Sequence, residues 1–107
     1  MPRSKGMVFV DIDGVLTLET KGAYSKRTPN RHNIARLSKL KEQGYKIVLW
    51  SSRFKRDKKV TLEWLKKYEV PFDELRLGKP RYVAWIDDKA VNICQNCKYK
   101  IKELFGE

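Results

Sequence analysis

Residues 7–17, MVFVDIDGVLT, decide the fold, because an apolar run of strand type leads directly into two aspartates and a glycine. Four consecutive apolar residues predict a buried strand, and aspartates two positions apart project to the same side of an extended chain. Gly14 allows the backbone to turn sharply after them. Paired carboxylates at the end of a buried strand are typical of catalytic sites, where Asp11 can act as a nucleophile.

Working outward from this stretch, apolar strands and helices alternate along all 107 residues. We predict strands over 7–11, 46–50 and 82–86, a brief edge strand over 75–77, and helices over 30–43 and 57–68. The remainder, through Ala90 and Val91 and then over 98–105, is also expected to be helical. Residues 17–29 are expected to form a loop or small hairpin, and Asn30 and Asp57 to cap the helices that follow them. This alternation predicts a single α/β domain over 1–107, a Rossmann-like three-layer α/β/α sandwich with a mainly parallel sheet.

Polar clusters follow each of the three predicted core strands. They are Asp11 with Asp13, Ser51 with Ser52 and Arg53, and Asp87 with Asp88. Ligands of parallel sheets bind beyond the carboxyl ends of the strands, so the three clusters are expected to meet at one site. Taken singly, each cluster has an ordinary structural explanation, such as a turn, a strand exit or a helix cap.

Four carboxylates at one site would repel each other, which implies a divalent cation. Oxygen ligands and a phosphate partner suit Mg²⁺ better than zinc or copper. Lys79, which lies before the last predicted strand, can add positive charge there, and the Ser51 hydroxyl can donate a hydrogen bond to a phosphoryl oxygen. For Arg53, contact with substrate and a surface ion pair both remain open.

These four elements, in this order, resemble the haloacid-dehalogenase superfamily over nearly the whole chain. Asp11 to Thr17 matches the family's nucleophile motif, and Ser51, Lys79 and the acidic pair Asp87 and Asp88 match the other three. The resemblance implies a HAD-like phosphatase in which Asp11 attacks phosphorus to form an aspartyl-phosphate and Asp13 is the general acid and base.

The same resemblance also assigns ligands and binding residues. It implies that Mg²⁺ is bound by Asp11, Asp13 through its main-chain carbonyl, and Asp87, with Asp88 ordering the water shell. Ser51 and Lys79 would hold the phosphoryl group, and Ser52 and Arg53 are further candidates for substrate binding. The segments between the motifs leave no room for the cap domain of larger members, so the site is expected to be open or covered by a second copy in a homo-oligomer.

Two closer resemblances compete over the substrate. Residues 47–53, 61–65, 71–74, 77–80 and 86–90 are similar to small uncapped phosphatases of capsular-polysaccharide biosynthesis. The Ile-Asp-Asp sequence at 86–88 is also similar to the 3′-phosphatase domain of polynucleotide kinases. The expected substrate is therefore a sugar phosphate, a nucleotide or a phosphorylated nucleic-acid end. A different possibility is a non-catalytic basic module that binds nucleic acid or an acidic protein on the same fold.

The net charge of +11, from 24 Lys and Arg against 13 Asp and Glu, favours an anionic partner, although thermal adaptation also enriches lysine. Cys94 and Cys97 form a C-x-x-C pair that is expected to be structural, with a redox or metal role as the alternative. We find no apolar segment of membrane-spanning length and no secretory signal, and we expect a cytoplasmic protein without a membrane partner.

Overall fold

A three-stranded parallel sheet forms the centre of the computed structural model, which describes residues 5–93 and 104–107. The strand order is β1 (Met7–Val10), β2 (Lys46–Trp50), β3 (Glu74–Arg76), so β2 lies between the other two. Val8 pairs with Ile47 and Leu49 with Leu75, which fixes the side chains that share a face. The strands predicted over 7–11 and 46–50 are confirmed, and the short edge strand forms one residue earlier than expected.

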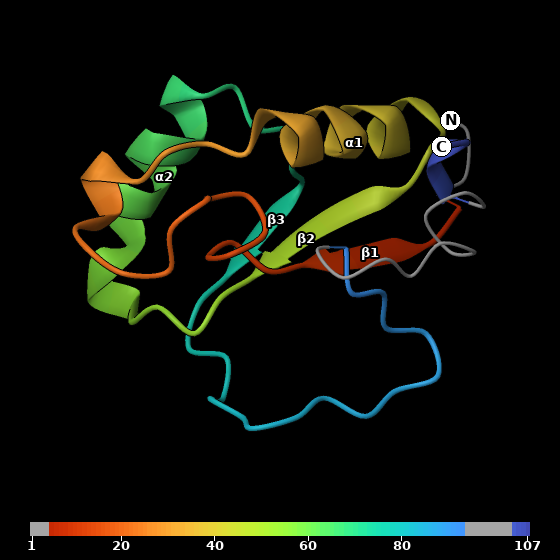
Figure 1. The fold of residues 1–107 in the computed structure, drawn as a ribbon. Coiled ribbons are helices and arrows are strands. Elements are labelled where there is room, and N and C mark those ends of the chain that lie inside the picture. Colours follow the sequence, from red (N-terminus) through yellow and green to blue (C-terminus); the bar gives the residue numbers. More distant parts are fainter. Residues whose placement is uncertain (1–4, 94–103) are drawn as a thin grey trace.

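Two helices connect these strands and cover one face of the sheet (Figure 1). Helix α1 (Arg31–Glu42) joins β1 to β2, and the Asn30 side chain caps it by accepting a hydrogen bond from Asn33 N. Helix α2 (Lys58–Lys67) joins β2 to β3 and follows the 3-10 helix η2 (Lys55–Asp57). Both helices were predicted from their apolar periodicity, but the predicted cap of α2 is wrong, because the Asp57 side chain makes no capping hydrogen bond.

The core lies between the helices and this face of the sheet. Its members are Ile12, Leu16, Ile34, Leu37, Leu40, Ile47, Leu49, Trp64, Leu65 and Val70. Burying aliphatic side chains of this size stabilises the fold by about 1.5–3 kcal/mol each. The core therefore fixes β1 and β2 against both helices and holds their carboxyl ends in place.

Residues 17–29, predicted to be a loop or small hairpin, form a loop that an antiparallel bridge closes as in a hairpin and that also contains a short helix. It includes the 3-10 helix η1 (Tyr24–Lys26), and an isolated antiparallel bridge pairs Thr17 with Pro29. The indole Nε1 of Trp64 donates a hydrogen bond of 2.8 Å to the carbonyl of Arg27, which ties the loop to α2. This loop consequently forms one wall of the site described below.

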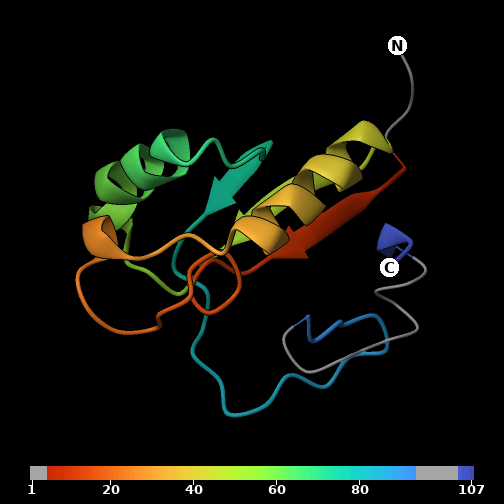
Figure 2. The ribbon, with the colours of Figure 1, turned by 45° about the horizontal axis from the view of Figure 1, so that its top comes forward.

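The strand predicted over Tyr82–Ile86 is wrong for the described structure. Residues 79–92 follow an irregular path on the side of the sheet away from the helices (Figures 1 and 2), and Val83 and Ile86 are fully exposed. The described residues thus form two layers, an α/β arrangement of Rossmann type, and a third layer is not among them. No helix in the described ranges is long and apolar enough to cross a bilayer.

The C-terminal helix prediction is wrong at Ala90 and Val91, which are not helical, and is otherwise tested only in part. Residues 104–105 are helical, but residues 98–103 and both cysteines, Cys94 and Cys97, lie outside the described residues. The last residue packs back onto α1, where the Arg36 guanidinium forms an ion pair with Glu107. Phe105 lies beside the same guanidinium, with its ring centroid 5.4 Å from Cζ.

Candidate active site

A tight turn after β1 presents the two aspartates. The carbonyl of Ile12 accepts hydrogen bonds from the three amides of residues 15–17, and Gly14 adopts a φ of +86° that side chains disfavour. Ile12 and Leu16 are completely buried and anchor the turn in the core. The turn therefore leaves Asp11 and Asp13 partly exposed at the carboxyl end of β1, where the sequence placed them.

Asp11 has a poorly compensated carboxylate. One oxygen, Oδ1, accepts a hydrogen bond of 2.8 Å from Ile12 N, and no ion pair in the described part of the chain involves this residue. Burial raises the pKa of Asp11, and this effect exceeds the opposing influence of the Ile12 amide and of Lys79. A desolvated carboxylate without an ion-pair partner is well suited to attack an electrophile or to attract a cation.

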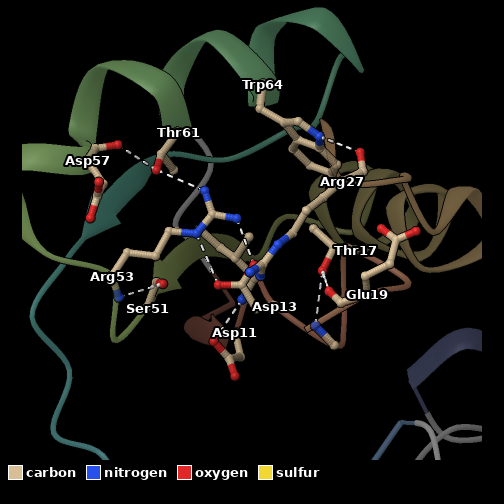
Figure 3. Close-up of polar contacts among 12 residues, drawn as sticks. Asp11, Asp13, Thr17, Glu19, Arg27, Ser51, Arg53, Asp57, Thr61 and Trp64 are labelled. Atoms are coloured by element: carbon tan, nitrogen blue, oxygen red, sulfur yellow. Dashed lines mark hydrogen bonds and ion pairs between the residues drawn. The ribbon is translucent and has the colours of Figure 1, made fainter. Parts of the chain in front are cut away.

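Asp13 has very different surroundings, because two guanidinium groups meet at its carboxylate (Figure 3). Arg53 binds it in a bidentate manner, with Nε donating to Oδ2 at 3.0 Å and Nη2 to Oδ1 at 2.7 Å. Arg27 Nη1 donates to the same Oδ1 at 2.5 Å. Such paired donors fix both the position and the orientation of a carboxylate. In Figure 3, the Asp11 side chain points away from this cluster.

Arg53 is itself held firmly from several directions. Only 2% of it is exposed, its Nη1 donates to Thr61 Oγ1 at 3.0 Å, and its Cζ lies 3.9 Å from the centroid of the Tyr24 ring. The Arg27 guanidinium lies over the same ring at 4.7 Å. Of the two interpretations left open for Arg53, the structure shows an ion pair, and it is buried rather than on the surface.

Ser51 and Lys79 are joined through the backbone. Ser51 is completely buried, its Oγ accepts a hydrogen bond of 3.1 Å from Arg53 N, and its carbonyl accepts one of 2.9 Å from Lys79 N. These bonds bring residue 79 beside the carboxyl end of β2, near enough to Asp11 for the lysine charge to lower the pKa of that carboxyl. Ser52, between Ser51 and Arg53, is half-buried. Asp11, Ser51 and Lys79 are thus brought together as the sequence predicted.

Asp87 and Asp88 do not join this group in the described structure. Both are exposed, and Asp87 accepts hydrogen bonds from Trp85 Nε1 at 3.3 Å and from Lys89 N at 2.7 Å, which lower its pKa. Within residues 5–93 and 104–107, no three His, Cys, Asp or Glu side chains are close enough to hold a metal ion. The expected gathering of four carboxylates depended on the strand over Tyr82–Ile86, which does not form here.

The donor set at the end of β1 fits Mg²⁺ only in part. Of the expected ligands, the Asp11 carboxylate and the Asp13 main-chain carbonyl lie in the turn after β1, while Asp87 lies elsewhere. Mg²⁺ commonly uses one or two protein carboxylates and completes its shell with water and phosphate oxygens. A shallow hollow nearby is lined by Lys55, Lys58, Leu75 and Leu77 and contains none of these acids.

Sequence reasoning missed Arg27 and Tyr24, which complete the surroundings of Asp13. Both lie in the loop before α1, where no periodic pattern or motif marks them. A buried cation opposite Asp13 was to be expected once both aspartates were placed at a strand end, but the sequence offers many arginines and lysines for that role. Only the fold of the loop, tied to α2 through Trp64, selects Arg27.

The whole arrangement has close counterparts among solved structures. A crystal structure of an MCSG target from Vibrio cholerae superposes with a TM-score of 0.76 at 28% identity, over 94% of this chain and 97% of that chain. The two chains share this fold over nearly their whole length. Two structures of the Pnkp1/Rnl/Hen1 RNA repair complex superpose with TM-scores of 0.62, at 27% and 26% identity.

The matches to the RNA repair complex cover 72% and 97% of this chain. This chain, in turn, spans only 28% and 34% of the chains that it matches. The chain therefore corresponds to about a third of those larger proteins. No family model and no curated protein sequence matches it. The comparisons establish a common α/β fold and a similarity to one part of an RNA repair assembly.

Proposed function

We propose that this protein hydrolyses phosphate monoesters and that Asp11 is the nucleophile. The observation that carries the proposal is the half-buried Asp11 carboxylate at the carboxyl end of β1, which has no ion-pair partner in the described structure and lies near Lys79. A second carboxylate, Asp13, is held two residues away. Parallel sheets bind their ligands beyond the carboxyl ends of the strands, which is where Asp11 and Asp13 lie.

The proposed reaction has two displacements at phosphorus. In the first, an Asp11 oxygen bonds to phosphorus while the ester P–O bond breaks, and the departing alkoxide takes a proton from the Asp13 carboxyl group. In the second, a water oxygen bonds to phosphorus, Asp13 accepts the proton of that water, and the P–O bond to Asp11 breaks. The sum is ester plus water giving alcohol plus inorganic phosphate, with both side chains restored.

The arginines fix the position of Asp13. Three hydrogen bonds from Arg27 and Arg53 hold its carboxylate in one orientation. For the first step Asp13 must carry a proton, so one guanidinium has to loosen its contact. Arg27 is the better placed to do so, because it makes one hydrogen bond to Asp13 whereas Arg53 makes two. Arg53 is a positioning residue in this scheme.

Mg²⁺ remains part of the proposal, supported by the carboxylate of Asp11 and by the anionic substrate. Bound there, the ion would neutralise charge on the phosphoryl group and on Asp11. Lys79 and the Ser51 hydroxyl would orient the phosphoryl group, the lysine through its charge and the serine by donating a hydrogen bond to a phosphoryl oxygen. Removal of divalent ions with EDTA should abolish turnover, and Mg²⁺ should restore it.

The central test compares two aspartate variants on an aryl phosphate. Asp11→Asn keeps the side-chain shape and removes the nucleophile, so kcat should fall by at least about a thousandfold. Asp57→Asn is the matched control, because Asp57 precedes α2 without capping it through its side chain. Its activity should stay within about twofold of the wild type. Undiminished turnover by a folded Asp11→Asn protein would refute the proposal.

A second, narrower proposal concerns the substrate, for which we favour a phosphorylated nucleic-acid end. The similarity to chains of an RNA repair complex supports it, as does the net charge of +11. Comparing kcat/KM for 3′-phosphorylated oligonucleotides, nucleotides and sugar phosphates tests it. Preference for a sugar phosphate would instead support the resemblance to small phosphatases of capsular-polysaccharide biosynthesis. Oligonucleotide binding without turnover of any ester would favour a non-catalytic module.

A further inference from the structure

The sheet face opposite the helices carries a continuous group of aromatic rings, which we call the aromatic face: Phe9, Trp50, Tyr82 and Trp85. Neighbouring rings touch, with centroid separations of 6.0 Å from Phe9 to Trp50, 6.0 Å from Trp50 to Trp85 and 5.3 Å from Trp85 to Tyr82. Between 47% and 52% of Phe9, Tyr82 and Trp85 is exposed. Large rings exposed together on a small protein usually mark a binding surface.

Cations lie directly against these rings. Lys79 Nζ is 5.5 Å from the ring centroid of Trp50, 5.0 Å from that of Tyr82 and 5.1 Å from that of Trp85. Arg76 Cζ is 5.5 Å from the ring of Phe9, although Glu74 also binds this guanidinium at 3.0 Å. No ion pair of the described residues involves Lys79. Its charge therefore remains available to an anionic ligand at the centre of the aromatic face.

The aromatic face adjoins the proposed catalytic carboxylate. Lys79 contacts three of the four rings and is close enough to Asp11 to lower the pKa of that carboxyl. Strand β1 connects the two places directly, since Phe9 precedes Asp11 by two residues. A ligand that reaches across Lys79 would thus touch both the rings and the reacting group.

Alternating rings and cations fit one partner chemistry in particular. Bases of a single strand stack on aromatic side chains regardless of sequence, while lysine and arginine bind the phosphates between them. A duplex would hide the faces of its bases, and an acidic protein would not need flat exposed rings. The positive net charge of the chain also attracts a polyanion from a distance.

We propose that the aromatic face binds the terminal nucleotides of a single-stranded nucleic acid and delivers the phosphorylated end to Asp11. This inference rests on the proposed function and extends it by locating the binding surface. The bases next to the end stack on Trp50, Trp85 and Tyr82, and Lys79 lies between the stacked bases and the terminal phosphate.

A rival surface provides the matched control. Helix α2 and the residues before it also carry many cations: Lys55, Arg56, Lys58, Lys59, Lys66 and Lys67. This surface also has an exposed ring, Phe54, and the Arg56 guanidinium lies over it, with Cζ 4.8 Å from the ring centroid. Phe54 and Trp85 are both about half exposed and both contact a cation, but they belong to different surfaces.

The experiment measures binding of a fluorescein-labelled oligouridylate that has no terminal phosphate, so that binding does not depend on turnover. Trp85→Ala should weaken binding by about tenfold or more, as expected for loss of one stacked base. Phe54→Ala should bind within about twofold of the wild type. Tryptophan emission of the wild type should be quenched by the oligonucleotide, and most of this quenching should be lost in Trp85→Ala.

Wild-type affinity in Trp85→Ala, or equal losses in both variants, would overturn the proposal. So would a wild-type dimer that Trp85→Ala converts to a monomer without affecting oligonucleotide affinity, since the face would then be a subunit interface. The proposed function fails separately: a wild-type protein that shows the expected binding but hydrolyses no phosphate ester would refute the chemistry alone. If both hold, Trp85→Ala should lower the ratio of kcat/KM for a 3′-phosphorylated oligonucleotide to that for an aryl phosphate.

Discussion

At the scale of single residues, Asp11 and Asp13 show how two identical side chains acquire different surroundings. Burial and the absence of an ion pair within the described structure leave the Asp11 carboxyl poorly compensated, whereas Arg27 and Arg53 fix Asp13 as an oriented carboxylate. The sequence predicts the pair, because the motif is local. It does not predict their partners, because Arg27 and Arg53 lie 14 and 40 residues beyond Asp13.

Asp11 should reduce the stability of the folded protein. Its raised pKa means that the folded state disfavours the charged form, so stability increases as pH falls through the folded pKa and is lower at neutral pH. Asp11→Asn removes this charge and should raise the free energy of unfolding by on the order of 1 kcal/mol, which corresponds to a rise in Tm of a few degrees. Thermal unfolding at neutral pH measures this change in Tm. A lower Tm would show that the carboxylate is stabilising.

Arg53 should matter more for stability than any exposed arginine. Arg53→Met leaves Asp13 with a single guanidinium partner and should cost about 3 kcal/mol, as for other broken buried ion pairs. The exposed Arg56 offers the matched control, and Arg56→Met should stay within about 0.5 kcal/mol of the wild type. Urea denaturation compares them, and equal losses would show that burial of Arg53 has no energetic consequence.

At the scale of elements, predictions succeeded where apolar periodicity gave an element a face to bury, with a side-chain cap at α1 but not at α2. Helices α1 and α2 and strands β1 and β2 each bury one face in a shared core. Residues 82–86 have equally strong strand character, yet their apolar side chains lie exposed and the rings of Tyr82 and Trp85 stack beside Trp50. Strand propensity is not sufficient, because a strand forms only where a partner edge and a buried face are available.

The turn after β1 should tolerate no side chain at Gly14. A Cβ there would lie 3.2 Å from Thr20 Cγ2 and would sit on a residue with a φ of +86°. Gly14→Ala should therefore cost about 1–2 kcal/mol. Gly22 separates the two causes, since its φ is +93° but nothing lies within 4 Å of the added Cβ. Gly22→Ala should cost less, and the reverse order in urea denaturation would contradict this account.

The contact between the chain end and α1 should depend on pH. The Arg36 guanidinium lowers the pKa of Glu107 from its ordinary value of 4.5 to about 2. The contact is therefore complete above pH 4.5 and is lost as pH falls toward 2. An NMR titration of the Glu107 carboxyl carbon should give a midpoint near 2, and Arg36→Gln should return it to the ordinary range. An ordinary midpoint in the wild type would exclude the ion pair in solution.

At the scale of the whole molecule, both helices cover one face of the sheet and the cationic aromatic face lies on the other. The candidate site lies where β1 and β2 end, so the helix-covered face of the sheet and the aromatic face both border it. The α/β class follows from the sequence because strand and helix patterns alternate. The meeting of all four motifs does not, since it depends on how residues 79–92 pack. Similarity to the Vibrio cholerae structure extends over 94% of the chain.

The central claim is that the phosphoryl group passes through a covalent intermediate on Asp11. The stereochemical course of hydrolysis tests it most directly, using a phosphorothioate monoester made chiral at phosphorus with ¹⁶O and ¹⁸O and hydrolysed in ¹⁷O-labelled water, so that the thiophosphate product carries sulfur and three different oxygen isotopes. Each in-line displacement inverts the configuration, so attack by Asp11 followed by attack by water gives net retention. We expect retention with the wild-type protein. Inversion would mean that water attacks the ester in a single step and would contradict the account.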